Sequence, residues 1–182
     1  RFVQTQALGE LDSSRGIVNL AGEQEENRLS GATRTTSLFV TDTWSEGNGR
    51  INRYNASGQP LPPLAPPPAD SFYFPRGLAV TKEGVVYVTD TGKHRVVKFN
   101  PDGTYAGAVV QGVLQEPVGI TLGLDGLLYI CDVGMKRVAA FTAQGRFVRQ
   151  LSLLGWKVSN DAALSWIEPY VAVDAKGFVY DT

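Results

Sequence analysis

Two stretches of the chain carry the same pattern: VVYVTDTGKHRVVKFNPDG at residues 85–103 and LLYICDVGMKRVAAFTAQG at residues 127–145. They align without a gap, 42 residues apart, and the match continues upstream, where PRGLAVTKEG (75–84) aligns with PVGITLGLDG (117–126). The identical pairs within the two stretches are Tyr87 and Tyr129, Asp90 and Asp132, Gly92 and Gly134, Arg95 and Arg137, Val96 and Val138, Phe99 and Phe141, and Gly103 and Gly145. Self-similarity at a fixed period indicates a repeat architecture.

Each repeat predicts four short strands separated by turns. In the first repeat we expect strands at residues 77–81, 85–90, 95–99 and 104–110, with Gly84 and the NPDG segment in turns. The second strand, VVYVTD, is a continuous apolar and β-branched run, which predicts burial on both faces between stacked sheets.

Further copies emerge once the pattern is known. SLFVTDT (37–43) and GRINRYNASG (49–58) match the second and third strands, and RGIVNL (15–20) resembles the inner strand RGLAVT, with an insertion at about residues 21–35. A fourth copy starts at PYVAVDAKG (169–177), and the opening RFVQTQALG resembles RFVRQLSLLG (146–155), an outer strand.

Four strands per unit and a period of about 42 residues predict an all-β fold, a β-propeller. A β-sandwich with chance similarity is the alternative, which a gapless match at a fixed period disfavours. The predicted division of residues 1–182 is the end of a preceding blade (1–14), a blade with insertions (15–74), two further blades (75–116 and 117–168) and the start of another (169–182).

The repeated segment VYVTDTGKHRVVKFNPDG resembles the NHL-repeat family, with P-x-G before the inner strand, VYVTD in the second and KHRV opening the third. The resemblance covers about residues 15–182 and is weakest at 21–35 and 59–74. It implies an NHL-type propeller, commonly of six blades, so we expect this chain to hold an incomplete ring and to be a fragment of a longer protein. The last copy also departs from the pattern, with VYDT where VYVTDT is expected.

Composition narrows the function classes. The net charge of −1 gives no electrostatic footprint for nucleic acid, so no nucleic-acid partner is expected. No stretch is long and apolar enough for a transmembrane segment. Cys131 is the only cysteine, so no disulfide within the chain and no cysteine zinc site is possible.

The acidic and basic side chains that recur in every copy are predicted to be structural. We expect each aspartate at the end of a second strand to fix the turn, either by contacting the arginine that opens the third strand or by contacting a backbone group. The recurring residues are Asp42 and Arg50, Asp90 and Arg95, and Asp132 and Arg137. His94 is expected in a structural turn. No catalytic motif is found, and no catalytic residue, metal ligand or cofactor is predicted.

Aromatic and cationic residues are predicted to gather on one propeller face, because connections from second to third strand and from outer strand to next inner strand lie at the same end of a blade. The candidate binding residues are Trp44, Lys93, His94, Lys136, Arg137, Trp156 and Trp166. The alternative is that these rings cover the blade ends. The proline-rich segment 59–75 is expected to replace a clear outer strand, as a stiff connector or as a contact for a neighbour.

Two functions of different class follow. The first is a non-catalytic binding or scaffold module that recognises another protein or protein complex, within a larger assembly or tethered to a membrane or surface protein. For it we expect a bacterial, extracytoplasmic location in the periplasm or at the cell surface. The alternative is a metal-dependent propeller enzyme, lactonase- or lyase-like, whose site is completed by missing blades. The resemblance implies histidine-held metal in the lyases and calcium held by acidic and amide groups in the lactonases, and neither set can be assigned here. Binding of single-stranded RNA is a weaker third possibility that the charge disfavours.

Overall fold

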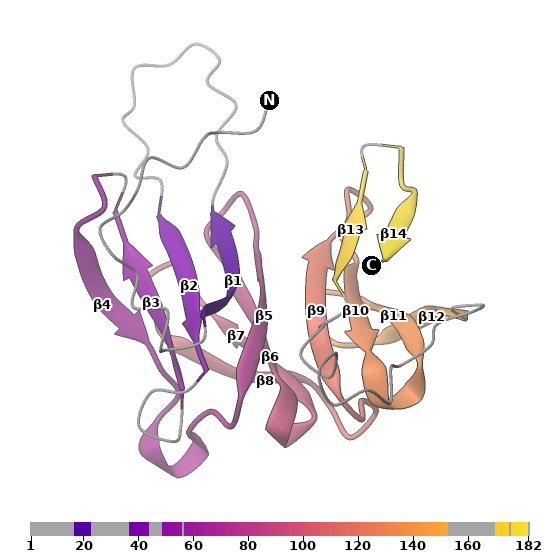
Figure 1. Ribbon diagram of the computed structural model, residues 1–182, viewed down its shortest axis with the longest axis horizontal. Coiled ribbons are helices and arrows are strands. Elements are labelled where there is room, and N and C mark those ends of the chain that lie inside the picture. The colour runs from indigo at the N-terminus through magenta and orange to yellow at the C-terminus, as the bar shows by residue number, and fades with distance from the viewer. Residues whose placement is uncertain are drawn as a thin grey trace.

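The computed structural model describes residues 17–22, 37–43, 49–55, 57–152, 170–174 and 176–181. They form three four-stranded antiparallel sheets and one two-stranded sheet (Figure 1). Within each four-stranded sheet the strands follow one another in chain order, each hydrogen-bonded to the next. The inner strands β1, β5, β9 and β13 contact one another in that order. This arrangement confirms the predicted all-β class and the four-stranded blades.

The strands of the three sheets, here called blades 1 to 3, have the following bounds. Blade 1 holds β1 (Ile17–Gly22), β2 (Leu38–Asp42), β3 (Arg50–Tyr54) and β4 (Pro60–Leu64). Blade 2 holds β5 (Pro75–Val80), β6 (Val86–Asp90), β7 (Arg95–Phe99) and β8 (Tyr105–Gln111). Blade 3 holds β9 (Pro117–Leu122), β10 (Leu128–Asp132), β11 (Arg137–Phe141) and β12 (Phe147–Ser152). A further hairpin pairs β13 (Val171–Val173) with β14 (Val179–Asp181), and the 3-10 turns η3 (Pro68–Asp70), η4 (Thr91–Lys93) and η5 (Val133–Met135) lie in connections.

The second strand of each blade is the most buried. All five residues of β6 and all five of β10 are buried, as their apolar, β-branched sequences predict. They lie between a neighbouring strand of their own sheet on each side and adjacent blades on each face. The hydrophobic effect therefore acts across blades as well as within them.

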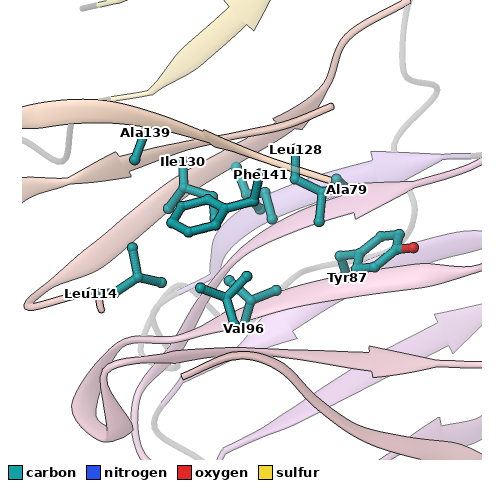
Figure 2. Packing of buried hydrophobic residues seen from close by; sticks show 10 residues of the cluster. Ala79, Tyr87, Val96, Leu114, Leu128, Ile130, Ala139 and Phe141 are labelled. Carbon is teal, nitrogen blue, oxygen red and sulfur yellow. The ribbon is translucent and has the colours of Figure 1, made fainter. Parts of the chain in front are cut away.

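The core between blades 2 and 3 shows how this works. Figure 2 shows Phe141 and Ile130 of blade 3 facing Val96 and Tyr87 of blade 2. Leu114, from the connection between β8 and β9, joins the same buried cluster. Two further clusters join blade 1 to blade 2 and blade 3 to the β13–β14 hairpin.

The inner strands approach closely enough to select glycine. A Cβ atom at Gly77, on β5, would collide with the carbonyl oxygen of Val118 on β9 and with Thr89 Oγ1. The P-x-G pattern therefore has a packing cause, namely the close approach of one blade's inner strand to the next.

The prediction that the proline-rich segment 59–75 replaces a clear outer strand is wrong. Residues Pro60–Leu64 form β4, which pairs with β3 through Leu64 opposite Ile51 and Leu61 opposite Arg53. Proline lacks a backbone N–H, but β4 has a neighbour in its sheet on one side only, so its outward-facing positions need no donor. Only the later part of the segment, which includes η3, is a connector.

Candidate functional site

Connections from different parts of the chain meet at one end of the blades. Gly92 N–H donates to Tyr73 O at 2.8 Å, and Val133 N–H donates to Glu116 O at 2.9 Å. His94 Nδ1 is in hydrogen-bond contact with the carbonyl oxygen of Gln115. This end is called the turn face here and comprises residues 68–74, 91–94, 112–116 and 133–136.

The aspartate and arginine of blade 2 form a buried pair beneath the turn face. Arg95 Nε donates to Asp90 Oδ2 at 2.8 Å, and Asp90 Oδ1 accepts the backbone N–H of Tyr73 at 2.7 Å. The side chain of Arg95 is 5% exposed and that of Asp90 is 0% exposed. Burial raises the pKa of Asp90, while the bonds from Tyr73 and Arg95 oppose that rise. The pair fixes the segment that leads into β5.

The same device recurs in blade 3. Asp132 Oδ1 accepts the backbone N–H groups of Gln115 and Glu116 at 3.0 and 2.9 Å. Arg137 donates from Nε to Asp132 at 3.2 Å and from Nη2 to Val113 O at 2.6 Å. The repeated carboxylates are thus used to hold connections in place, which is the role that their recurrence predicts.

Blade 1 carries a looser version. Arg50 Nε lies 3.4 Å from Asp42 Oδ2, and Asn52 Nδ2 lies 3.5 Å from the same oxygen. The side chain of Arg50 is far more exposed than that of Arg95. All three predicted Asp–Arg pairs are therefore in contact, with the blade 2 pair the most buried.

Blade 2 adds an ion network on the same face. Asp70, at the end of η3, receives Arg95 Nη1 at 2.6 Å and the hydroxyl of Tyr105 at 2.5 Å, and it lies 3.7 Å from Lys93 Nζ. The Tyr105 bond and then the Arg95 bond lower the pKa of Asp70. Burial, together with the Asp70 bond, raises the pKa of Tyr105 to about 12.

The predicted cationic binding residues differ in whether their side chains already make hydrogen bonds within the protein. Lys93 Nζ donates to Ser71 O, and Arg137 is held by Asp132 and Val113. Lys136 is exposed and makes no side-chain hydrogen bond or ion pair among the described residues. Lys93, His94 and Lys136 thus lie on the turn face and Arg137 follows it as the first residue of β11, and whether they bind a partner stays a prediction. Trp44, Trp156 and Trp166 lie outside the described residues.

Threonines join neighbouring blades, a feature that the sequence reading missed. Thr43 Oγ1 donates to Pro75 O at 2.8 Å, and Thr91 Oγ1 donates to Pro117 O at 2.6 Å. Thr89 Oγ1 donates to Val118 O at 2.6 Å. The recurring T-D-T at the end of the second strand was visible in the sequence, but its partners lie on the next blade. Cys131 and Val133 replace both threonines in blade 3.

An open cleft between blades 2 and 3 is the second feature that was missed. It encloses about 710 Å³ and is lined by Gly112, Val113, Leu114, Gln115, Met135, Arg137, Phe147 and Gln150. Val113 and Met135 are each 50% exposed and Phe147 is 48% exposed. Three large apolar side chains thus surround an open hollow with an arginine at its edge.

A second hollow of about 400 Å³ lies on the turn face. It is lined by Phe74, Arg76, Thr91, Gly92, His94, Gln115, Glu116 and Gly134. Its side chains carry charges of both signs, in contrast to the apolar walls of the cleft. Among the residues that the structure describes, no group of three or more histidine, cysteine, aspartate or glutamate side chains is placed to hold a metal ion.

Helix content is small, and in the described part of the chain no helix is long and apolar enough to cross a membrane. The helical elements there are the three short 3-10 turns.

Comparisons with known proteins identify the repeat. The model of the NHL repeat matches residues 72–99. None of the curated proteins matches the chain significantly.

Solved structures of similar fold include enzymes and a protein complex. Virginiamycin B lyase from Staphylococcus aureus is 16% identical with a TM-score of 0.59, and the match covers 90% of this chain and 53% of that one. A gluconolactonase from Xanthomonas campestris is 19% identical with a TM-score of 0.58, over 80% and 52% of the chains. A chain of a nidogen/laminin complex is 24% identical with a TM-score of 0.55, over 65% and 43%.

At these identities the likeness concerns the fold alone, and the chain spans about half the length of these structures. The described part of this chain consists mainly of four-stranded blades, in the succession that the internal repeat predicts. Residues 72–99 match the NHL repeat, and the described blades have the fold of part of a β-propeller.

Proposed function

We propose that the chain is a non-catalytic recognition or scaffold module that binds another protein through the turn face and the cleft that adjoins it between blades 2 and 3. The observation that carries this proposal is the cleft between blades 2 and 3, where Val113, Met135 and Phe147 are about half exposed around one hollow. Clustered exposed apolar side chains are typical of protein contact surfaces, whereas singly exposed ones are ordinary.

The use of the repeated charges supports the same view. Asp90, Asp132, Arg95 and Arg137 are engaged with connections of the propeller itself. A carboxylate whose oxygens are already bonded to backbone N–H groups and an arginine is a poor general acid or base, because its partners fix its position and occupy its oxygens. The described turn face therefore offers surface for contact rather than a group poised for chemistry.

The fold by itself does not choose between recognition and catalysis, because the solved structures that share it include a lyase, a lactonase and a protein complex. A metal-dependent lyase- or lactonase-like activity is distinguished by metal content. The recognition proposal expects no stoichiometric calcium or zinc in the native protein. The recognition proposal would be overturned if each molecule held one tightly bound ion and if a chelator removed both that ion and an enzymatic activity.

The test of recognition is a charge placed in the cleft. Phe147→Asp in the intact protein should abolish recovery of a stoichiometric partner by crosslinking and affinity purification from the native cells. Leu124→Asp is the control, because Leu124 is 80% exposed in the β9–β10 turn and does not line the cleft. Equal partner recovery with both variants would show that the cleft is not the contact surface.

The same proposal places the protein outside the bacterial cytoplasm, as part of a larger assembly or of a surface protein. Fractionation of the native cells tests this placement. Recovery of the protein with periplasmic or surface material agrees with it, and recovery with the cytoplasm contradicts it.

A further inference from the structure

The connection between blades 1 and 2 places a carboxylate against blade 2, at a position called the first cleft here. Between blades 1 and 2, the Asp70 carboxylate at the end of η3 contacts Arg95 Nη1, the Tyr105 hydroxyl and, at 3.7 Å, Lys93 Nζ. Arg95 Nη2 also donates to the backbone oxygen of Asp70 at 3.0 Å. Three prolines precede this aspartate in the segment PPPAD. A proline-flanked carboxylate is therefore the observed occupant of the first cleft.

The cleft between blades 2 and 3 is built on equivalent positions. Phe147 stands where Tyr105 stands, since Phe141–Phe147 and Phe99–Tyr105 are corresponding strand pairs with ring centroids 5.6 and 5.5 Å apart. Arg137 corresponds to Arg95 in the repeat alignment, and Met135 to Lys93.

The two interblade positions differ in whether the preceding connection supplies a carboxylate. Asp70 lies five residues before Pro75, and the residue five before Pro117 is Gly112. The connection is also shorter, with residues 112–116 in place of residues 65–74. Among the described residues, none supplies a carboxylate at this position, and the second cleft is open there.

Arg137 shows the consequence. Its Nη1 group donates to Gln150 Oε1 at 3.0 Å on the exposed side, in the place where Arg95 Nη1 meets the Asp70 carboxylate. A neutral amide is a weaker acceptor for guanidinium than a carboxylate.

We propose that the cleft between blades 2 and 3 binds a proline-containing segment of a partner protein whose aspartate or glutamate displaces Gln150 from Arg137. The prolines or adjacent apolar side chains pack on Val113, Met135 and Phe147. This inference rests on the proposed recognition function and specifies the chemistry of the partner at the same site.

The probe is the chain's own sequence for the first cleft. A fluorescently labelled peptide Leu-Ala-Pro-Pro-Pro-Ala-Asp-Ser, the sequence of residues 64–71, is titrated with the intact protein and its anisotropy is recorded. We expect saturable binding that weakens about tenfold or more when the peptide aspartate is replaced by asparagine, as expected for loss of a charge-assisted hydrogen bond. Equal affinity for the two peptides would overturn the proposal.

A pair of protein variants tests the site. Gly112 has a φ of +78°, a conformation in which aspartate and asparagine are the better tolerated substitutions, and a Cβ atom there meets open space. Gly112→Asp supplies the missing carboxylate within the chain and should weaken peptide binding about tenfold more than Gly112→Asn. Equal effects of the two variants, with matched melting temperatures, would overturn the assignment of the carboxylate to this cleft.

The two proposals fail separately. Loss of the native partner with Phe147→Asp but no discrimination between the aspartate and asparagine peptides would refute the acidic, proline-containing partner and leave recognition standing. Peptide discrimination with unchanged partner recovery would refute the recognition site for that native partner and leave the carboxylate chemistry of the cleft standing.

Discussion

Asp70 joins the proline-rich connection to blade 2 through charge. Its carboxylate is bonded to Tyr105 and Arg95 and faces Lys93, and these groups hold its pKa below the ordinary value of 3.8. A carboxylate whose pKa is lower in the folded than in the unfolded state stabilises the fold above the unfolded pKa. That contribution is lost as the pH falls through the folded pKa.

We therefore expect Asp70→Asn to lower the melting temperature near neutral pH and to have a smaller effect in acid. Melting temperatures of both proteins from about pH 6 to about pH 2 test this expectation. Asp90 has its pKa raised by burial and is present in both proteins, so the difference between them isolates Asp70. A difference in melting temperature that stayed constant across the range would contradict the role assigned to the Asp70 carboxylate.

The bounds of individual strands were predicted accurately where the copies share the same sequence pattern. The predicted strand at residues 95–99 coincides with β7, that at 85–90 begins one residue before β6, and that at 104–110 is displaced from β8 by one residue. The expectation that the proline-rich segment replaces an outer strand was wrong at β4. A strand at the edge of a blade tolerates prolines, so their presence does not exclude one. The cleft escaped prediction because it depends on differences between copies, such as Gly112 in place of Asp70, rather than on their likeness.

Thr91, the first residue of η4, bonds to the next blade, so its energetic role belongs to the contact between elements. Thr91 is buried, and its hydroxyl donates to Pro117 O. Thr91→Val keeps the shape, matches Val133 at the equivalent position, and leaves that carbonyl without its donor. We expect a loss of about 1–3 kcal/mol in the free energy of unfolding, measured by urea titration.

Thr104→Val is the control, since Thr104 is exposed and its hydroxyl bonds only within the adjacent turn, to Asn100 and Asp102. A smaller loss is expected there. Equal losses for the two variants would show that the bond between blades carries no special weight.

For the whole molecule, stability depends on cores that lie between blades, because each sheet buries its faces only against its neighbours. Phe141 is fully buried in the cluster that blades 2 and 3 share, beside Ile130 and Val96 (Figure 2). Phe141→Ala should cost about 3–5 kcal/mol in the free energy of unfolding, as lost burial plus the cavity left behind. Phe147→Ala, on the half-exposed rim of the same interface, should cost much less.

Urea unfolding followed by both circular dichroism and tryptophan fluorescence measures this difference in the free energy of unfolding. It also tests whether the two signals change in a single transition. Because the cluster draws residues from both blades, Phe141→Ala should shift both signals together, as one cooperative transition. Two separated transitions in the variant would mean that the blades do not unfold as one cooperative unit. In that case the cleft between them would be a hinge between separate units, and a ligand bound there would change their relative position rather than meet a preformed surface.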